Sequence, residues 1–285
     1  MFVITGATGH TGSAAAEALL AAGQQVRVVV RDRAKAEPLR ARGAEIFVAD
    51  LADTDALARA VHGAAGVFLI SPPDLGAQDF IGERRRLTQR QVDVLAAEKV
   101  PHVVLLSSIG AQHASGTGLI LSTHHAEQQL RSSGLAATFV RAGYFVENWA
   151  AVLGAVKGDG VLPSFTAADR RMPSVSTADI GKAIAQALLE GPRGVRVIEL
   201  SGPSDVSPNE VAATFSRILG RPVQVVEAPL ASIVPTFTSF GMSANIAGLF
   251  REMYEGMREG RIAAEGGEQV RGTTPLETTL RALLG

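Results

Sequence analysis

The chain has 285 residues and a nearly balanced charge, with 27 lysines and arginines against 28 aspartates and glutamates and a formal net charge of −1. This balance argues against a nucleic-acid partner, because binding to phosphate backbones needs an excess of positive charge; the run Arg84, Arg85, Arg86 and Arg90 is expected to be a solvated helix surface. The absence of cysteine excludes disulfides and thiolate metal sites. No apolar run reaches the ~20 residues of a membrane span and no basic leader precedes the first strand, so we expect a cytoplasmic protein.

Residues 1–30 predict a buried strand, a glycine-rich turn, a helix and a second strand. The apolar segment 1–4 runs into glycines spaced by three, followed by an alanine-rich run at 13–22 and an apolar stretch at 25–30. In a dinucleotide-binding turn the first glycine relaxes the backbone, the second allows close approach of a pyrophosphate, and the third lets the helix pack on the sheet. The free amides of the helix and nearby hydroxyls then bind phosphate oxygens. We expect the dinucleotide to contact Gly6, Thr8, Gly9, His10, Thr11 and Gly12.

Helical and strand-like segments alternate through the next hundred residues. Helices are predicted at 33–42, 54–62, 78–99 and 121–132, and strands at 44–48, 66–70, 103–107 and 137–141. Such alternation indicates β-α-β units with right-handed crossovers. The sequence therefore predicts an α/β fold with a Rossmann-type, doubly wound parallel sheet over residues 1–151, with ligands at the carboxyl ends of the strands.

The pattern changes at residue 152. A helix start at 176–179 leads into 180–189, a strand follows at 195–200, and a second helix start at 207–210 opens 211–219. A short strand at 223–227 precedes a mostly helical remainder, 232–284. We expect residues 152–285 to form a smaller, mostly helical domain that can return strands or helices to the first, with a small substrate at the interface of the two parts.

The residues after the second, third and fourth strands suggest which nucleotide is bound. Arg31 occupies the position where an NAD-selective site usually has an acidic residue, so it predicts NADP(H) over NAD(H), through pairing with the 2′-phosphate and with help from Arg33 and Lys35. Asp32 is the alternative, since its carboxylate on the ribose would relax or reverse this preference. Asp50 and Leu51 are predicted to contact the adenine, although Asp50 can also cap a turn. Ser71 and Pro72 are predicted to lie along the middle of the cofactor, although a rigid loop without a ligand explains the prolines here equally well.

The fifth and sixth predicted strands end in residues suited to the nicotinamide and a substrate. Ser107 and Ser108 can donate to a substrate carbonyl or satisfy local backbone groups. The segment 141–149 brings together Tyr144, Asn148 and the sole tryptophan, Trp149. The two aromatic rings can form the walls of a site for a flat substrate, or they can pack in a core.

Four motifs together resemble the NmrA-like branch of the atypical short-chain dehydrogenases/reductases. They are residues 6–12, 30–32, 107–110, and 127–135 running into 140–148; the tail at 250–284 is similar to that of triphenylmethane reductase and quinone reductase members. The resemblance implies NADP(H) binding. It also implies one of two functions: reduction of quinones, dyes or other conjugated acceptors, or binding of the nucleotide to report redox state.

The chain departs from the wider superfamily at the catalytic pair. Ordinary members use a tyrosine acid with a lysine four residues later, and the corresponding positions are Leu119 and Thr123. Alcohol dehydrogenation by that proton relay is therefore not expected, whereas hydride transfer to a conjugated acceptor needs less acid assistance. His124, beside the vacant position, is a candidate proton donor or a helix-surface residue. His124 and His125 point to different helix faces, and no metal site is expected.

The leading hypothesis is an NADPH-dependent reductase of a quinone-like or other conjugated small molecule. The alternative is a non-catalytic NADP(H) sensor. The missing tyrosine–lysine pair favours the sensor, whereas the aromatic segment after residue 141 favours the enzyme. The predicted partner is a small-molecule hydride acceptor, with no nucleic acid and no membrane. The catalytic candidates are Ser107, Ser108, His124, Tyr144 and Asn148, and Ser107 and Tyr144 are also predicted to contact the cofactor.

Overall fold

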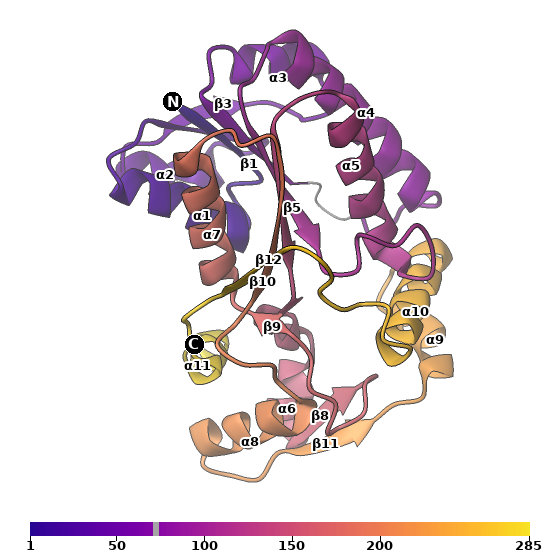
Figure 1. Ribbon diagram of the computed structural model, residues 1–285. Helices are drawn as coiled ribbons and strands as arrows, with labels where there is room; N and C mark the ends of the chain where they lie inside the picture. Colours follow the sequence, from indigo (N-terminus) through magenta and orange to yellow (C-terminus); the bar gives the residue numbers. More distant parts are fainter. Residues whose placement is uncertain (71–73) are drawn as a thin grey trace.

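The computed structural model describes residues 1–70 and 74–285, and its centre is an eight-stranded sheet in the order β12-β10-β6-β5-β4-β1-β2-β3 (Figure 1). All neighbouring strands of this sheet run parallel. The strands are β1 (Phe2–Thr5), β2 (Val26–Val30), β3 (Glu45–Val48), β4 (Gly66–Leu69), β5 (Val103–Ser108), β6 (Ala137–Ala142), β10 (Val195–Ser201) and β12 (Glu268–Arg271). The predicted doubly wound α/β fold is confirmed.

Helices cover both faces of this sheet because successive strand residues point to opposite sides. Ile4 faces a core formed with α1 (His10–Ala21), α2 (Glu37–Ala41) and α7 (Thr177–Glu190). Val3, its neighbour, faces a second core formed with α3 (Thr54–Val61), α4 (Phe80–Ala97) and α5 (Leu121–Ser132). The helices α1 and α7 approach closely at Gly181, where a Cβ atom would lie 2.4 Å from the Cβ of Ala14.

One predicted helix is shorter than expected. Instead of a helix over 33–42, the chain forms a 3₁₀ turn, η1 (Ala34–Ala36), and then the short α2. Asp32 favours the turn because its carboxylate accepts a hydrogen bond from the amide of Ala34 at 2.9 Å. Pro38 then lies in the first turn of α2, where a missing N–H is tolerated.

A smaller part of the molecule has its own core, which includes Trp149, Leu162, Phe215 and Leu280. Its elements are η3 (Val146–Val152), α6 (Leu153–Asp159), β8 (Val161–Ser164), α8 (Pro208–Leu219), β11 (Gln224–Glu227) and α11 (Leu276–Leu284). The predicted helix start at Ser207 is a capping box with Glu210. Trp149 is therefore a core residue rather than a wall of the substrate site.

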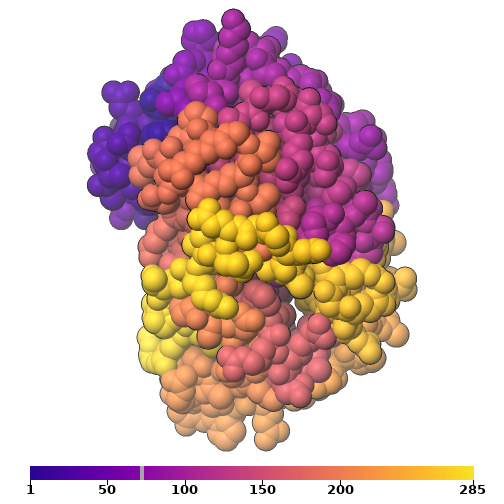
Figure 2. Space-filling view, viewed as in Figure 1, coloured from indigo at the N-terminus to yellow at the C-terminus, as the bar shows by residue number. Residues whose placement is uncertain are grey.

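The chain returns to the main sheet twice after residue 152. β10 pairs with β6, and β12 pairs with β10 at the sheet edge. The stretch 232–284 is mostly helical, as predicted, and the unpredicted β12 interrupts it between α10 (Ala244–Arg258) and α11. Figure 2 shows this last part of the chain, in yellow, lying across the middle of the molecule.

The remaining elements flank the carboxyl ends of the central strands. A two-residue pair, β7 (Tyr144–Phe145) and β9 (Ser174–Val175), follows β6, and η2 (Gly118–Ile120) precedes α5. η4 (Leu230–Ser232) and α9 (Ile233–Ser239) lead into α10, which packs on η2. Among the described residues, no helix is both long and apolar enough to cross a bilayer.

Candidate functional site

The glycine turn after β1 has the conformation that a dinucleotide-binding turn requires. Gly6 has a φ of +63°, in the left-handed region that favours glycine. A Cβ at Gly12 would lie 2.4 Å from the carbonyl oxygen of Gly6, so α1 can pack against the turn only with glycine there. A Cβ at Gly9 would meet nothing closer than 3.5 Å, which leaves open space beside the turn.

The N-terminus of α1 carries no side-chain cap. Five other helices, α3, α4, α7, α8 and α10, are capped by Asp53, Asp79, Ser176, Ser207 and Ser243. At α1 the N-cap is Gly9 and no acidic residue occupies the first turn. The unpaired amides and the positive end of the helix dipole therefore suit an anion, and together with the glycine turn they fit the pyrophosphate of a dinucleotide. Thr8, Gly9 and His10 are exposed at this point, whereas Thr11 is buried.

The two competing residues at the end of β2 have different surroundings. Asp32 binds the amide of Ala34, so its carboxylate is engaged in the local turn. Arg31 is exposed and makes no ion pair with any residue that the structure describes. Asp50 likewise accepts from the amide of Ala52 at 2.9 Å, and Leu51 packs against the core beneath it. Ser71 and Pro72 lie outside the described residues.

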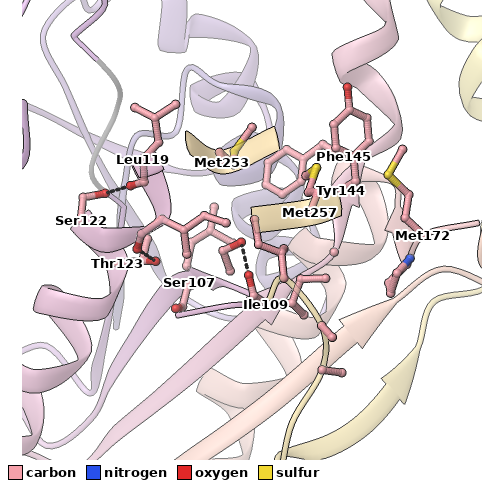
Figure 3. Close-up of a pocket in the computed structure, with 18 of the residues that line it drawn as sticks. Ser107, Ile109, Leu119, Ser122, Thr123, Tyr144, Phe145, Met172, Met253 and Met257 are labelled. Atoms are coloured by element: carbon pink, nitrogen blue, oxygen red, sulfur yellow. Dashed lines mark hydrogen bonds between the residues drawn. The ribbon is translucent and has the colours of Figure 1, made fainter. Parts of the chain in front are cut away.

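A cavity of about 640 Å³ opens at the carboxyl ends of β4, β5 and β6 (Figure 3). One side of it, which we call the roof, is formed by Phe250, Met253 and Met257 of α10 and by Ile262 after it. The opposite side, the floor, consists of polar residues on α4, β5 and α5: Gln91, Ser107, Ser108, Ser122 and Thr123. The remaining lining includes aliphatic residues, among them Leu69, Ile70, Leu105, Leu106 and Leu119, and the polar residues Thr88, Arg170, Arg171 and Asp205. The volume and the apolar roof suit a flat organic molecule.

Ser107 is held by a buried ion pair below the floor. Its hydroxyl donates to Glu127 at 2.6 Å, and Glu127 receives two hydrogen bonds from Arg141, at 2.9 and 2.7 Å. Arg141 and Glu127 are 5% and 1% exposed. The hydrogen bond to Glu127 is the main cause that raises the pKa of Arg141, with burial acting in the opposite direction. Of the two roles considered for this hydroxyl, donation to a substrate carbonyl or to local backbone, the structure shows neither: it donates to Glu127, which leaves oxygen lone pairs toward the cavity.

Tyr144 and Asn148 line another part of the cavity. In Figure 3 the hydroxyl of Tyr144 points away from Ser107. Its polar neighbours are Asn148 and Tyr254 of α10. Burial is the main cause that raises the pKa of Tyr144 well above 10.0; the neighbouring Tyr254 adds to this and Asn148 opposes it. A neutral phenol is therefore the stable form at neutral pH, and it can donate a hydrogen bond.

His124 does not lie among the residues that line the cavity. Its Nδ1 is 2.8 Å from the carbonyl oxygen of Ala111, which points to a structural hydrogen bond. Thr123, the preceding residue, reaches the cavity instead. Burial lowers the pKa of the adjacent His125, and electrostatic repulsion from the neighbouring His124 and Arg85 lowers it further. No cluster of metal-binding side chains occurs among residues 1–70 and 74–285.

A comparison with protein families identifies the chain. The model of the NmrA-like family matches residues 1–275. This protein belongs to the NmrA-like family. The relatives that resemble it over most of its length include an NAD(P)H azoreductase of Xenophilus azovorans, 28% identical over 89% of this chain and 86% of the relative. Quinone oxidoreductase 2 of Escherichia coli is 29% identical over 92% of this chain and 90% of the relative.

Solved structures agree with this assignment. The NADPH-dependent quinone oxidoreductase of E. coli, in complex with NADPH, superimposes over the whole of both chains with a TM-score of 0.83 and 27% identity. Triphenylmethane reductase of Citrobacter sp. has the same fold, with a TM-score of 0.83 at 20% identity over 99% of this chain and 100% of that one. The homologues of this NmrA-like protein thus include NAD(P)H-dependent oxidoreductases, as the sequence motifs predicted.

Several residues of the cavity were not predicted from the sequence. The roof comes from α10, more than a hundred positions after β5, and no local motif marks it. Gln91 lies within a helix whose neighbouring residues are mostly polar, so nothing in the pattern distinguished it as buried. Arg141 did carry a signal, because a charged residue inside the apolar stretch 137–142 is unusual without a buried partner.

Proposed function

We propose that this NmrA-like protein is an NADPH-dependent reductase that transfers hydride to a quinone-like or other conjugated small molecule. The observation that carries the proposal is the cavity of about 640 Å³ beside the glycine turn, at the strand ends where a doubly wound fold binds its ligands. The cavity extends beyond its polar floor to the apolar side chains of α10, and a protein that only reports nucleotide binding needs no such additional space.

The nucleotide would be bound by local backbone and by one cation. The glycine turn and the free amides of α1 would bind the pyrophosphate, and Arg31 would pair with the 2′-phosphate, which NADH lacks. The engagement of Asp32 with Ala34 supports this preference, because it leaves Arg31 as the unpaired charge at the end of β2. When bound, NADPH supplies the hydride.

The acceptor would lie between the nucleotide and the roof. The side chains of Phe250, Met253 and Met257 give it an apolar surface and exclude water. Tyr144 and Asn148 would donate hydrogen bonds to an acceptor oxygen on the side away from Ser107. After hydride transfer to a neutral acceptor, the oxygen carries a negative charge, and the O–H proton of Tyr144 neutralises it. The tyrosinate then takes a proton from the neighbouring Tyr254, which regains one from solvent.

The test is oxidation of NADPH by the purified protein, followed by absorbance, against a panel of quinones, azo dyes, triphenylmethane dyes and simple enones. We expect saturable turnover with at least one class and a higher kcat/KM with NADPH than with NADH. A protein that binds NADPH tightly but turns over no member of the panel, and whose partner binding changes with the nucleotide, would overturn the proposal in favour of a redox sensor.

A further inference from the structure

Four hydroxyls of the cavity floor, those of Ser107, Ser108, Ser122 and Thr123, share one property: each donates its proton to the protein. Ser107 donates to Glu127 at 2.6 Å, and Ser108 donates to the carbonyl of Ile109 at 3.0 Å. Ser122 donates to the carbonyl of Leu119 at 2.8 Å, and Thr123 to that of Ile120 at 2.8 Å (Figure 3). These hydroxyls therefore offer the cavity only oxygen lone pairs.

Gln91 extends this pattern and adds an unpaired atom. It is 1% exposed, and its amide nitrogen donates to the carbonyl of Leu51 at 3.4 Å. Its carbonyl oxygen Oε1 is buried and has no hydrogen-bond partner among the described residues. The donor bond to Leu51 fixes which end of the amide is which, so the unpaired atom is an acceptor. Buried acceptors without a partner are rare in folded proteins and disfavour the folded state, so this atom calls for a functional reason.

A floor of this kind selects a ligand by its hydrogen-bond donors. An oxidised quinone has carbonyl oxygens, which only accept, so it would leave Gln91 unpaired. The nicotinamide half of NADPH has donors in both its ribose hydroxyls and its carboxamide amino group. The floor also lies at the carboxyl ends of β4 and β5, where a doubly wound sheet binds its ligand.

We propose that Gln91 is a nucleotide ligand whose Oε1 accepts a hydrogen bond from the nicotinamide half of NADPH. This inference rests on the proposed function, and it divides the cavity by polarity. The floor of acceptors holds the nucleotide, and the hydride acceptor lies on the side of the cavity lined by Tyr144 and Asn148. Ser107 then belongs with the nucleotide as an acceptor, and its proton stays on the bond to Glu127.

The experiment measures binding without turnover, by calorimetry with two probes. NADPH carries both halves of the dinucleotide, and 2′,5′-ADP carries only the adenosine half with the 2′-phosphate. For Gln91→Met, which keeps the length of the side chain and removes its polar atoms, we expect about tenfold weaker binding of NADPH and unchanged binding of 2′,5′-ADP. The thermal midpoint of the nucleotide-free variant should be unchanged or higher, because the unpaired oxygen is gone.

Gln89→Met is the matched control. Gln89 lies on the same helix, is exposed, and donates to Asp93 at 2.8 Å, so its replacement should alter neither affinity. Equal NADPH affinity in Gln91→Met and the wild type would overturn the inference. So would an equal loss for both probes with a lower thermal midpoint, which would make Gln91 a structural residue. A wild-type protein that binds neither probe would overturn the proposed function itself.

Discussion

The glycine turn and the cavity lie at the same edge of the sheet, yet the chain builds them in different ways. Residues 6–12 form the turn from consecutive backbone, and the geometry of Gly6 and Gly12 is sufficient to explain it. The cavity instead collects side chains from β4, β5, α4, α5, the segment after β6 and α10. The first region depends on local backbone space and the second on long-range packing, so changes in the two should have different effects.

The largest effect is expected below the cavity floor. Arg141→Met leaves Glu127 buried without its main partner, and we expect the free energy of unfolding in urea to fall by about 3–5 kcal/mol. Arg131→Met is the control, because Arg131 contacts the same carboxylate at 3.6 Å but is 36% exposed, and its loss should cost at most about 1 kcal/mol. Similar losses in the two variants would contradict a dominant role for the buried pair.

Tyr144→Phe should separate two classes of acceptor. Reduction of a quinone needs a proton as well as a hydride, so its kcat should fall about a hundredfold. A cationic triphenylmethane dye takes up hydride alone, and its reduction should be unchanged. Because the pKa of Tyr144 is raised above 10.0, the wild-type rate with quinones should not fall between about pH 6 and pH 9 through loss of this proton. Equal losses for quinone and dye would argue against proton donation.

Gly12→Ala tests the turn. Its Cβ would lie 2.4 Å from the oxygen of Gly6 and 3.0 Å from the Cα of Ala7, which are both backbone atoms. We expect a loss of about 1–3 kcal/mol in unfolding free energy together with weaker NADPH binding. Gly9→Ala, with its nearest contact at 3.5 Å, should leave the stability of the nucleotide-free protein nearly unchanged. If the two variants were equally stable, the close packing of α1 on the turn would not be essential.

Arg31→Ala should change selectivity rather than folding. The ratio of NADPH to NADH affinity should fall about tenfold or more, as expected for the loss of a charge-assisted hydrogen bond. Arg42→Ala removes a similarly exposed cation, which pairs with Glu17 at 3.0 Å, and should leave the ratio unchanged. An unaltered ratio in Arg31→Ala would assign the preference to other residues.

The smallest effect is expected at His124. Its ring bonds the carbonyl of Ala111 and does not reach the cavity, so His124→Ala should keep kcat within about twofold of the wild type and reduce stability by about 1 kcal/mol. A large loss of kcat at unchanged stability would restore His124 as the proton donor.

The same contrast explains how far the sequence could predict the molecule. The turn, the strands and the position of Arg31 follow from local signals, such as glycine spacing and apolar runs. β12 was missed because its residues, Glu268–Arg271, are largely exposed at the sheet edge and have no apolar pattern. Gln91 and the roof were missed because their burial depends on contacts between distant segments. The hydroxyl of Ser107 was expected to donate to a substrate carbonyl or to local backbone, and its bond to the distant Glu127 is one that no sequence pattern could show.

The pairing of β12 beside β10 has a consequence for how the protein forms during synthesis. The edge of the central sheet cannot be completed until residues 268–271 have left the ribosome, and Leu280 of α11 must follow before the smaller core closes. The glycine turn can fold early, while the sheet edge and the smaller core wait for residues 268–284. A nascent chain stalled shortly before β12 would therefore show the glycine turn beside an incomplete sheet edge.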